Sequence, residues 1–214
     1  MERALFYLHL YPGTEAEYDR RHEAIWPEHA EAIRSSGMRV MTGFRRGTDV
    51  WYYIECEPDR DTAFARHEAI PVVAEWGASF LTIIDEIRGP DGSMLWYEEV
   101  FHSDSSVAGP AMRGLFGLVV APDRIADYEA LHAKPWPDMI AALDAAGFRN
   151  YTGFRRGNHV VYYGEFVPDL ERCMARMDDF EVNARWGAAF EGIITTIRDE
   201  NGALITAREV FHQE

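Results

Sequence analysis

The hexapeptide Thr42-Gly43-Phe44-Arg45-Arg46-Gly47 occurs a second time, unchanged, at Thr152–Gly157. Two more stretches recur with the same offset of 110 residues, Trp76–Ala78 and Glu99–His102. Aligned without gaps, residues 3–102 and 113–212 share about 42 identities in 100, against about 1 in 16 for ordinary composition. The chain is therefore a tandem duplication. We predict repeats at residues 1–102 and 113–214, joined by a polar, small-residue linker at 103–112.

Each repeat reads as strand, helix, strand, strand, helix and closing strand. In the first repeat, the apolar runs and turn residues predict strands at Leu5–Leu10, Met38–Arg46, Val50–Cys56 and Leu95–His102. Helical sequence is expected between a capping box of Thr14 with Glu17 and a terminating glycine, Gly37. A second helical stretch is predicted from Pro58 through Phe80, and the sequence leaves Ile83–Arg88 open between helix end and strand.

A four-stranded sheet with helices on one face must cover its other, apolar face. A second copy of the unit is the simplest cover. The predicted class is therefore α+β, with two ferredoxin-like α+β repeats whose sheets pack together as a fused dimeric α+β barrel. Pro27 and Pro137 are favourable only as the first residue of a helix, so we expect a helix break near Ala24–Trp26 and a new helix from Pro27.

Composition limits the partners that the chain can have. It carries 36 acidic and 21 basic residues, a formal charge of −15, which argues against nucleic acid or an anionic membrane as a partner. No signal peptide is visible and no apolar run approaches the length of a membrane span, so we expect a soluble, cytoplasmic protein with a small-molecule substrate. The duplication predicts a monomer that is a fused pseudo-dimer, or a homodimer of it. Cys56 and Cys173 are expected to be free, buried thiols.

The candidate catalytic residues lie in the first predicted helix. Tyr18 and His22 are four residues apart and share one helix face, and Trp26 follows. The second repeat keeps all three residue types, although the tripeptide at 23–25 has changed completely. An imidazole with a neighbouring phenol can act as a general acid or base, while a buried packing stripe is the alternative reading. The predicted catalytic residues are Tyr18, His22, Tyr128 and His132.

Tryptophans and arginines are the candidate binding residues. Trp76 is followed by Gly77 and Ala78, which leave room for a flat ligand or a sugar against the indole, although a core role is equally compatible. One arginine of each Arg-Arg pair could face the interior, paired with Glu55 or Glu165 or with an anionic ligand. The substrate-binding candidates are Trp26, Trp76, Trp136, Trp186, Arg45 and Arg155.

Common cofactor, nucleophile and metal motifs are absent from the sequence. It has no GxGxxG, Walker loop, GxSxG or HExxH pattern, which disfavours cofactor and serine chemistry. His22 and His29 do not have the spacing of a helical metal-binding pair, and His29 has Met139 opposite it in the second repeat. We predict no cofactor and no metal.

Tyr18–Glu28, with the sequence YDRRHEAIWPE, resembles the first helix of the L-rhamnose mutarotase family. The likeness extends over nearly all of the first repeat, and the second repeat keeps a reduced form of it. The resemblance implies a dimeric α+β barrel and a cofactor-free enzyme that interconverts pyranose anomers. It also implies that His22 is the catalytic acid and that Tyr18 and Trp76 line the sugar site. The Arg-Arg pairs and the fusion depart from the family pattern.

Three functions stay open at this point. The first is a mutarotase acting on a hexose or deoxyhexose such as L-rhamnose, and the second is an isomerase or cyclase acting on a non-sugar biosynthetic intermediate. The third is a binding protein without catalysis. A polar pocket with a histidine against a tryptophan favours the first, a long apolar pocket with an arginine at its end favours the second, and a filled interior favours the third.

Overall fold

The computed structural model describes all 214 residues, and their contacts divide the chain into two units. Unit 1 comprises Met1–Tyr97 and Arg208–Glu214, and unit 2 comprises Glu98–Ala207. Unit 1 holds β1 (Glu2–Leu10), α1 (Glu15–Glu23), α2 (Pro27–Ser36), β2 (Met38–Arg46), β3 (Asp49–Cys56), α3 (Arg60–Glu68), α4 (Pro71–Ser79) and β4 (Ile84–Glu86). Unit 2 holds β6 (Met112–Val120), the 3-10 turn η1 (Pro122–Arg124), α5 (Ile125–Ala133), α6 (Pro137–Ala146), β7 (Phe148–Arg156), β8 (His159–Phe166), α7 (Leu170–Met177), α8 (Glu181–Ala189) and β9 (Ile194–Thr196).

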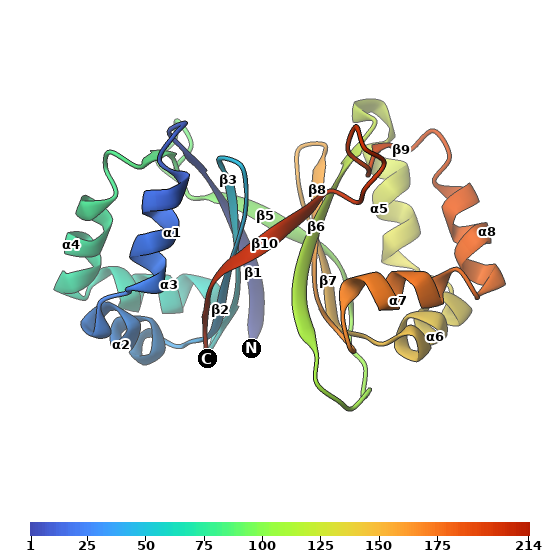
Figure 1. Cartoon of the computed structure of the whole chain (residues 1–214), viewed down its shortest axis with the longest axis horizontal. Coiled ribbons are helices and arrows are strands. Elements are labelled where there is room, and N and C mark those ends of the chain that lie inside the picture. Colours follow the sequence, from blue (N-terminus) through green and yellow to red (C-terminus); the bar gives the residue numbers. More distant parts are fainter. The chain divides into compact units, whose positions relative to one another are not determined.

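Two further strands, β5 (Leu95–Ser103) and β10 (Thr206–Gln213), each belong to both units (Figure 1). The first part of β5 pairs with β1 in unit 1, and its remainder, Glu98–Ser103, pairs with β7 in unit 2. Strand β10 begins on β6 in unit 2 and ends on β2 in unit 1. A bulge lies at the same place in both strands, between Glu99 and Phe101 and between Glu209 and Phe211. Each repeat therefore supplies the last strand of the other unit.

The long strands of unit 1 are hydrogen-bonded in the order β10-β2-β3-β1-β5, and those of unit 2 in the order β5-β7-β8-β6-β10. Within each unit the strands are antiparallel, and the helices lie on one side of them (Figure 1). This connectivity confirms the predicted class, an α+β fold of two ferredoxin-like repeats with the strand arrangement of a dimeric α+β barrel. The core of each unit lies between its helices and its strands.

The expected helix break is confirmed. Helix α1 ends at Glu23 and α2 begins with Pro27 as its first residue, because proline lacks an N–H to donate within a helix. Gly37 then ends α2 with a φ of +103°, a left-handed conformation that side chains disfavour. A Cβ at Gly37 would also lie 2.3 Å from the carbonyl oxygen of Glu57.

Two local predictions were wrong. The capping box does not form, because the Thr14 hydroxyl donates to the carbonyl oxygens of Tyr11 and Ile83, and Glu17 pairs with arginines of its own helix. The single helix expected through Phe80 is two helices, α3 and α4, because Pro71 begins a new one. The open segment at 83–88 contributes the short strand β4.

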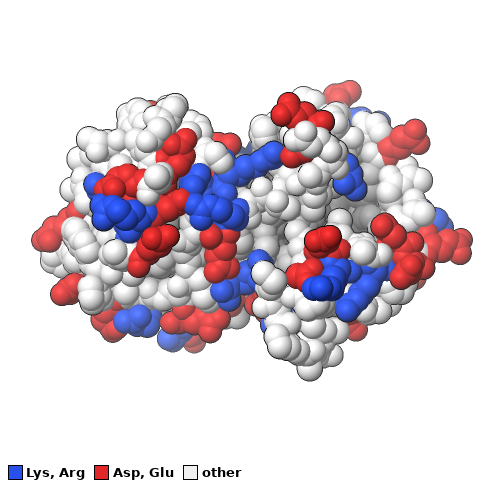
Figure 2. Space-filling view, viewed as in Figure 1, with Lys and Arg blue, Asp and Glu red and all other residues white.

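Acidic and basic side chains are intermixed on the face shown in Figure 2. Many of them form exposed ion pairs within one helix, such as Arg34 with Glu31 at 2.8 Å, and these contribute little to stability. None of the helices combines the length and the apolar character needed to cross a membrane.

Candidate active sites

His22 lies in the last turn of α1 and is held by its own helix. Its Nδ1 lies 2.9 Å from the carbonyl oxygen of Tyr18. A carbonyl only accepts, so Nδ1 carries the proton and Nε2 presents a lone pair. Nε2 makes no hydrogen bond to the protein. Burial lowers the pKa of His22 to about 4, and this outweighs the opposing effect of the Tyr18 carbonyl, so the ring is neutral at pH 7.

Aromatic rings surround His22 on several sides. Its ring centroid lies 4.2 Å from that of Tyr18 and 5.2 Å from that of Phe80, and Trp76 meets it edge-on at 5.8 Å. Phe211, delivered by β10, lies 5.8 Å away. These contacts fix the imidazole while leaving Nε2 open.

Tyr18 and Tyr52 form a buried pair of hydroxyl groups beside this histidine. Their oxygens are 2.6 Å apart, and burial raises the pKa of both phenols, so both are neutral. One hydroxyl donates to the other, so one proton of the pair is left to donate elsewhere. Tyr52 was missed from the sequence, although Tyr52-Tyr53 recurs as Tyr162-Tyr163. Its ring packs over Gly43, where a Cβ would lie 2.7 Å from the ring.

A cavity of about 400 Å³ opens beside His22 in unit 1. Its size is that of a small-molecule site. Most of its lining is apolar, including Ile33, Met41 and Ile87. The polar lining comprises Tyr18, Tyr52, three histidines (His22, His29 and His67) and an ion pair of Glu68 with Arg88 at 2.9 Å. Unit 1 thus offers an apolar hollow with a few convergent polar groups.

Unit 2 repeats the arrangement of the histidine and the two tyrosines, but one hydrogen bond differs. Nδ1 of His132 is 3.0 Å from the carbonyl oxygen of Tyr128, but Nε2 is 2.6 Å from the hydroxyl of Tyr162. Tyr162 therefore donates to His132 and accepts from the Tyr128 hydroxyl, also at 2.6 Å. Burial lowers the pKa of His132 as well. The lone pair that is open in unit 1 is occupied in unit 2.

The space beside His132 is also divided differently. Two cavities of about 140 and 660 Å³ share His132, Tyr151, Tyr162 and Trp186 in their lining. Tyr151 stands where unit 1 has Met41, and its ring stacks on Tyr162 at 5.0 Å. The Tyr151 ring therefore lies between two cavities in unit 2, where unit 1 has a single cavity beside His22.

Of the predicted binding tryptophans, Trp76 and Trp186 line the cavities described above. Trp26 is 38% exposed and meets Trp76 edge-on at 5.1 Å. Trp136 meets Trp186 in the same way, at 5.1 Å. Trp26 and Trp136 therefore support the cavity-lining indoles from outside.

Neither Arg45 nor Arg155 lines the three cavities described above. Arg45 donates to both carboxylate oxygens of Asp19, at 2.9 and 2.6 Å, and Arg155 binds Glu129 in the same position of unit 2. The acidic partners are thus on α1 and α5, not the expected Glu55 and Glu165. No group of three or more histidine, cysteine or acidic side chains is arranged to hold a metal ion.

Comparison with known proteins matches the sequence of this chain to one family. The sequence profile of the L-rhamnose mutarotase family matches residues 3–103 and again 113–213. The protein named L-rhamnose mutarotase from Oceanobacillus iheyensis is 27% identical over 46% of this chain and 95% of its own length. Those of Burkholderia cenocepacia and Rhizobium johnstonii are 32% and 33% identical, over 43% and 48% of this chain and 86% and 96% of their own.

Two solved structures share the fold over the whole chain. They are monooxygenase-like proteins from Fusobacterium nucleatum and Lactobacillus acidophilus, each 10% identical, with TM-scores of 0.60 and 0.59. They cover 99% and 98% of this chain, and 93% and 94% of their own chains are matched. At that identity the likeness concerns the fold alone. The family profile, which matches both repeats, decides the assignment: this chain belongs to the L-rhamnose mutarotase family.

Proposed function

We propose that this chain interconverts the pyranose anomers of a hexose or deoxyhexose such as L-rhamnose, without a cofactor, and that His22 is its main catalytic group. The observation that carries the proposal is the open Nε2 lone pair of His22 beside the cavity, on a ring fixed through Nδ1. A neutral imidazole so held can accept a proton and give it back without reorienting.

Mutarotation needs such a shuttle. The base removes the proton of the C1 hydroxyl, the bond between C1 and the ring oxygen breaks, and the ring oxygen receives a proton. Rotation about the C1–C2 bond and closure on the other face of the aldehyde give the second anomer. The C1 hydroxyl and the ring oxygen are bonded to the same carbon, so Nε2 of His22 can serve both.

The depressed pKa of His22 sets the balance between its two roles. At a pKa of about 4 the neutral ring is a weak base, but the imidazolium formed during the reaction is a strong acid. It therefore returns its proton readily to the ring oxygen. We assign the remaining donor proton of the Tyr18–Tyr52 pair to a hydrogen bond with the sugar, and Trp76 to the wall of the site.

His132 and Tyr128 are proposed as the corresponding pair of a weaker second site. A sugar there would have to displace the hydrogen bond from Tyr162 to Nε2. The two histidines are thus matched controls for each other within one chain.

Saturation-transfer NMR of anomer exchange tests the proposal directly, with L-rhamnose, L-fucose and other aldoses. We expect His22→Ala to lower the enzymatic exchange rate about 10²- to 10⁴-fold, the usual contribution of a general acid or base. His132→Ala should retain most of it. A folded wild-type protein that accelerates no aldose would exclude the mutarotase proposal.

One observation favours a second candidate function, an isomerase or cyclase on a less polar, non-sugar intermediate. The cavity lining is predominantly apolar, and Arg88 lies among it, although paired with Glu68. Such a ligand would bind unit 1 with a negative heat-capacity change, the mark of apolar burial. Two results together would support this second function. The protein would neither bind sugars nor accelerate their anomer exchange, and calorimetry would show binding of an apolar ketone or lactone.

A further inference from the structure

Two more histidines line the unit 1 cavity without an assigned role. His29, on α2, is only 5% exposed, and its Nδ1 is buried without a hydrogen-bond partner. His67, on α3, has a buried Nε2 that also lacks one. The two rings are 5.3 Å apart, and both lie in the wall of the cavity that His22 shares. Buried polar atoms without partners are rare, so each needs an explanation.

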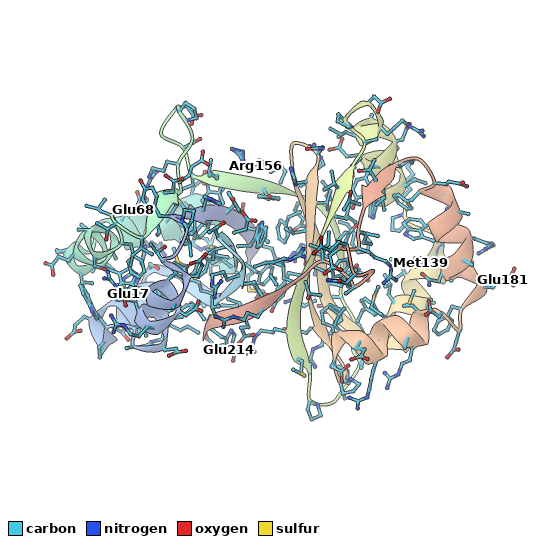
Figure 3. The ribbon with its side chains drawn as sticks, turned by 45° about the horizontal axis from the view of Figure 1, so that its top comes forward. Glu17, Glu68, Met139, Arg156, Glu181 and Glu214 are labelled. Carbon is cyan, nitrogen blue, oxygen red and sulfur yellow. The ribbon has the colours of Figure 1, made fainter.

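The fold does not explain them. The second repeat has Met139, labelled in Figure 3, and Met177 at the corresponding positions. Both methionines are buried, with exposures of 3% and 4%, in a unit that forms the same elements. Methionine thus fills these sites without orphaned polar atoms. The histidine pair occurs only in the unit whose catalytic histidine has an open Nε2.

The orientation of His29 is fixed by stacking. The His29 ring lies on the indole of Trp76, with centroids 4.8 Å apart and planes 17° from parallel. One face of Trp76 is therefore covered by an imidazole. His29 is thus held in the wall of the cavity, with its ring centroid 5.3 Å from that of His67.

The chemistry of the pair selects uncharged ligands. Burial lowers the pKa of His29 to about 4, with His67 and His22 adding to the effect, and burial also lowers the pKa of His67. Two neutral imidazoles each offer one N–H and one lone pair, which matches hydroxyl groups that both donate and accept. A carboxylate or phosphate needs a cation, and the cation lining this cavity, Arg88, is bound to Glu68.

We propose that His29 and His67 form a second subsite in unit 1 that binds two neighbouring hydroxyl groups of an uncharged polyol, while its reacting end lies at His22. This inference rests on the proposed function for the sugar's orientation, with C1 toward Nε2 of His22. It restricts the substrate class to neutral sugars with vicinal hydroxyl groups, and excludes sugar acids and sugar phosphates.

A titration separates the subsite from catalysis. The full chain, labelled with ¹⁵N-histidine and with its resonances assigned from His29→Met and His67→Met, is titrated with methyl α-L-rhamnoside. This glycoside keeps the vicinal hydroxyls but cannot mutarotate. We expect saturable shifts of the His29 and His67 ring nitrogens, none with tetrahydropyran, which lacks hydroxyls, and none with D-galacturonate. Ring nitrogens that stay unmoved while the glycoside binds elsewhere would overturn the subsite.

Kinetics give an independent reading. The double variant His29→Met/His67→Met, which imports the residues of unit 2, should raise KM for L-rhamnose about tenfold, the effect of losing one or two neutral hydrogen bonds. Its kcat should stay within about twofold of wild type, because His22 is untouched. His67→Gln, which keeps a donor and an acceptor at this position, should raise KM less than His67→Met does. The control Met139→Leu/Met177→Leu should change neither constant.

The two proposals fail separately. If wild-type protein accelerates L-rhamnose and the double variant has unchanged KM, the subsite is excluded and the mutarotase stands. If no aldose exchanges faster, the proposed function fails, and the glycoside titration still decides whether the pair binds a vicinal diol.

Discussion

Replacing His29 with methionine should make the protein more resistant to acid. His29 is buried and neutral in the folded protein, and burial holds its pKa at about 4, whereas an unfolded histidine titrates near 6.5. Between these two values the unfolded chain binds a proton that the folded chain does not. Stability is therefore unaffected above pH 6.5, falls as the pH drops from about 6.5 to about 4, and falls no further from this cause below pH 4.

The size of the effect follows from the same values. The full difference in pKa corresponds to about 3 kcal/mol at 1.36 kcal/mol per pKa unit. The ring borders an open cavity, and solvent screening there reduces the contribution, so we expect about 2 kcal/mol. That is a large part of the 5–15 kcal/mol typical of domain stability.

Urea unfolding followed by tryptophan fluorescence measures this difference. Wild type and His29→Met are compared at pH 7.5 and pH 4.5, so that carboxylates common to both cancel. The loss of unfolding free energy on acidification should be about 2 kcal/mol smaller in the variant. His159→Met, at an exposed position of β8, is measured alongside as the control for introducing a methionine.

An identical acid loss in wild type and His29→Met would refute the reasoning. It would mean that His29 takes up a proton in the folded protein without cost. The neutral-imidazole argument for the hydroxyl subsite would then lose its electrostatic basis.

Gly43→Ala should destabilise the protein by about 1–3 kcal/mol and lower kcat for anomer exchange. The new Cβ would lie 2.7 Å from the Tyr52 ring and displace the Tyr52 hydroxyl that is bonded to Tyr18. An unchanged melting temperature and an unchanged kcat would refute this. Gly77→Ala, within α4 and with nothing within 4 Å of the new Cβ, should instead stabilise by about 0.5–1 kcal/mol in thermal unfolding, and a loss of stability would count against the packing described. Tyr162→Phe should free Nε2 of His132 from its hydrogen bond. The anomer exchange that remains in His22→Ala should therefore be faster in the double variant His22→Ala/Tyr162→Phe. An unchanged rate would mean that unit 2 does not contribute to catalysis. Cys56, whose thiol pKa burial raises to about 12, should react with a disulfide reagent at pH 8 only after unfolding; rapid labelling of native protein would contradict its burial.

The fold was predictable because duplication makes its signals visible twice. The constant offset of 110 residues aligns turns, glycines and strands without ambiguity, and Pro27 and Gly37 act through backbone chemistry alone. The Thr14 capping box failed for a non-local reason. The Thr14 hydroxyl donates to the carbonyl oxygen of Ile83, 69 residues away, and no local sequence pattern predicts that partner.

The site was predictable only where helix periodicity applies. Tyr18 and His22 are one turn apart and do meet, whereas Trp26 has the same spacing but follows the end of α1 at Glu23. It therefore leaves the helix face and becomes partly exposed. Arg45 has its acidic partner Asp19 on a helix, which strand alternation does not indicate.

The residues that sequence reasoning missed come from other elements. Tyr52 is on β3, Phe211 on β10, and His29 and His67 on α2 and α3. Their convergence on one cavity depends on packing. The available signal was comparison of the two repeats, because His29 and His67 both become methionine where Tyr52 and Phe211 keep aromatic counterparts.

The exchange of β5 and β10 has an evolutionary consequence. Phe211 is encoded in the second repeat but packs on His22 in unit 1, and Phe101 is encoded in the first repeat but packs on His132 in unit 2. Substitutions in the tail of one repeat are therefore selected for their effect on the neighbouring unit. The duplicated halves can diverge in their helices, as His29 and Met139 have done, while Glu-Val-Phe-His stays the same in both tails. Deleting one half would remove from the remaining unit the strand that supplies Phe101 or Phe211.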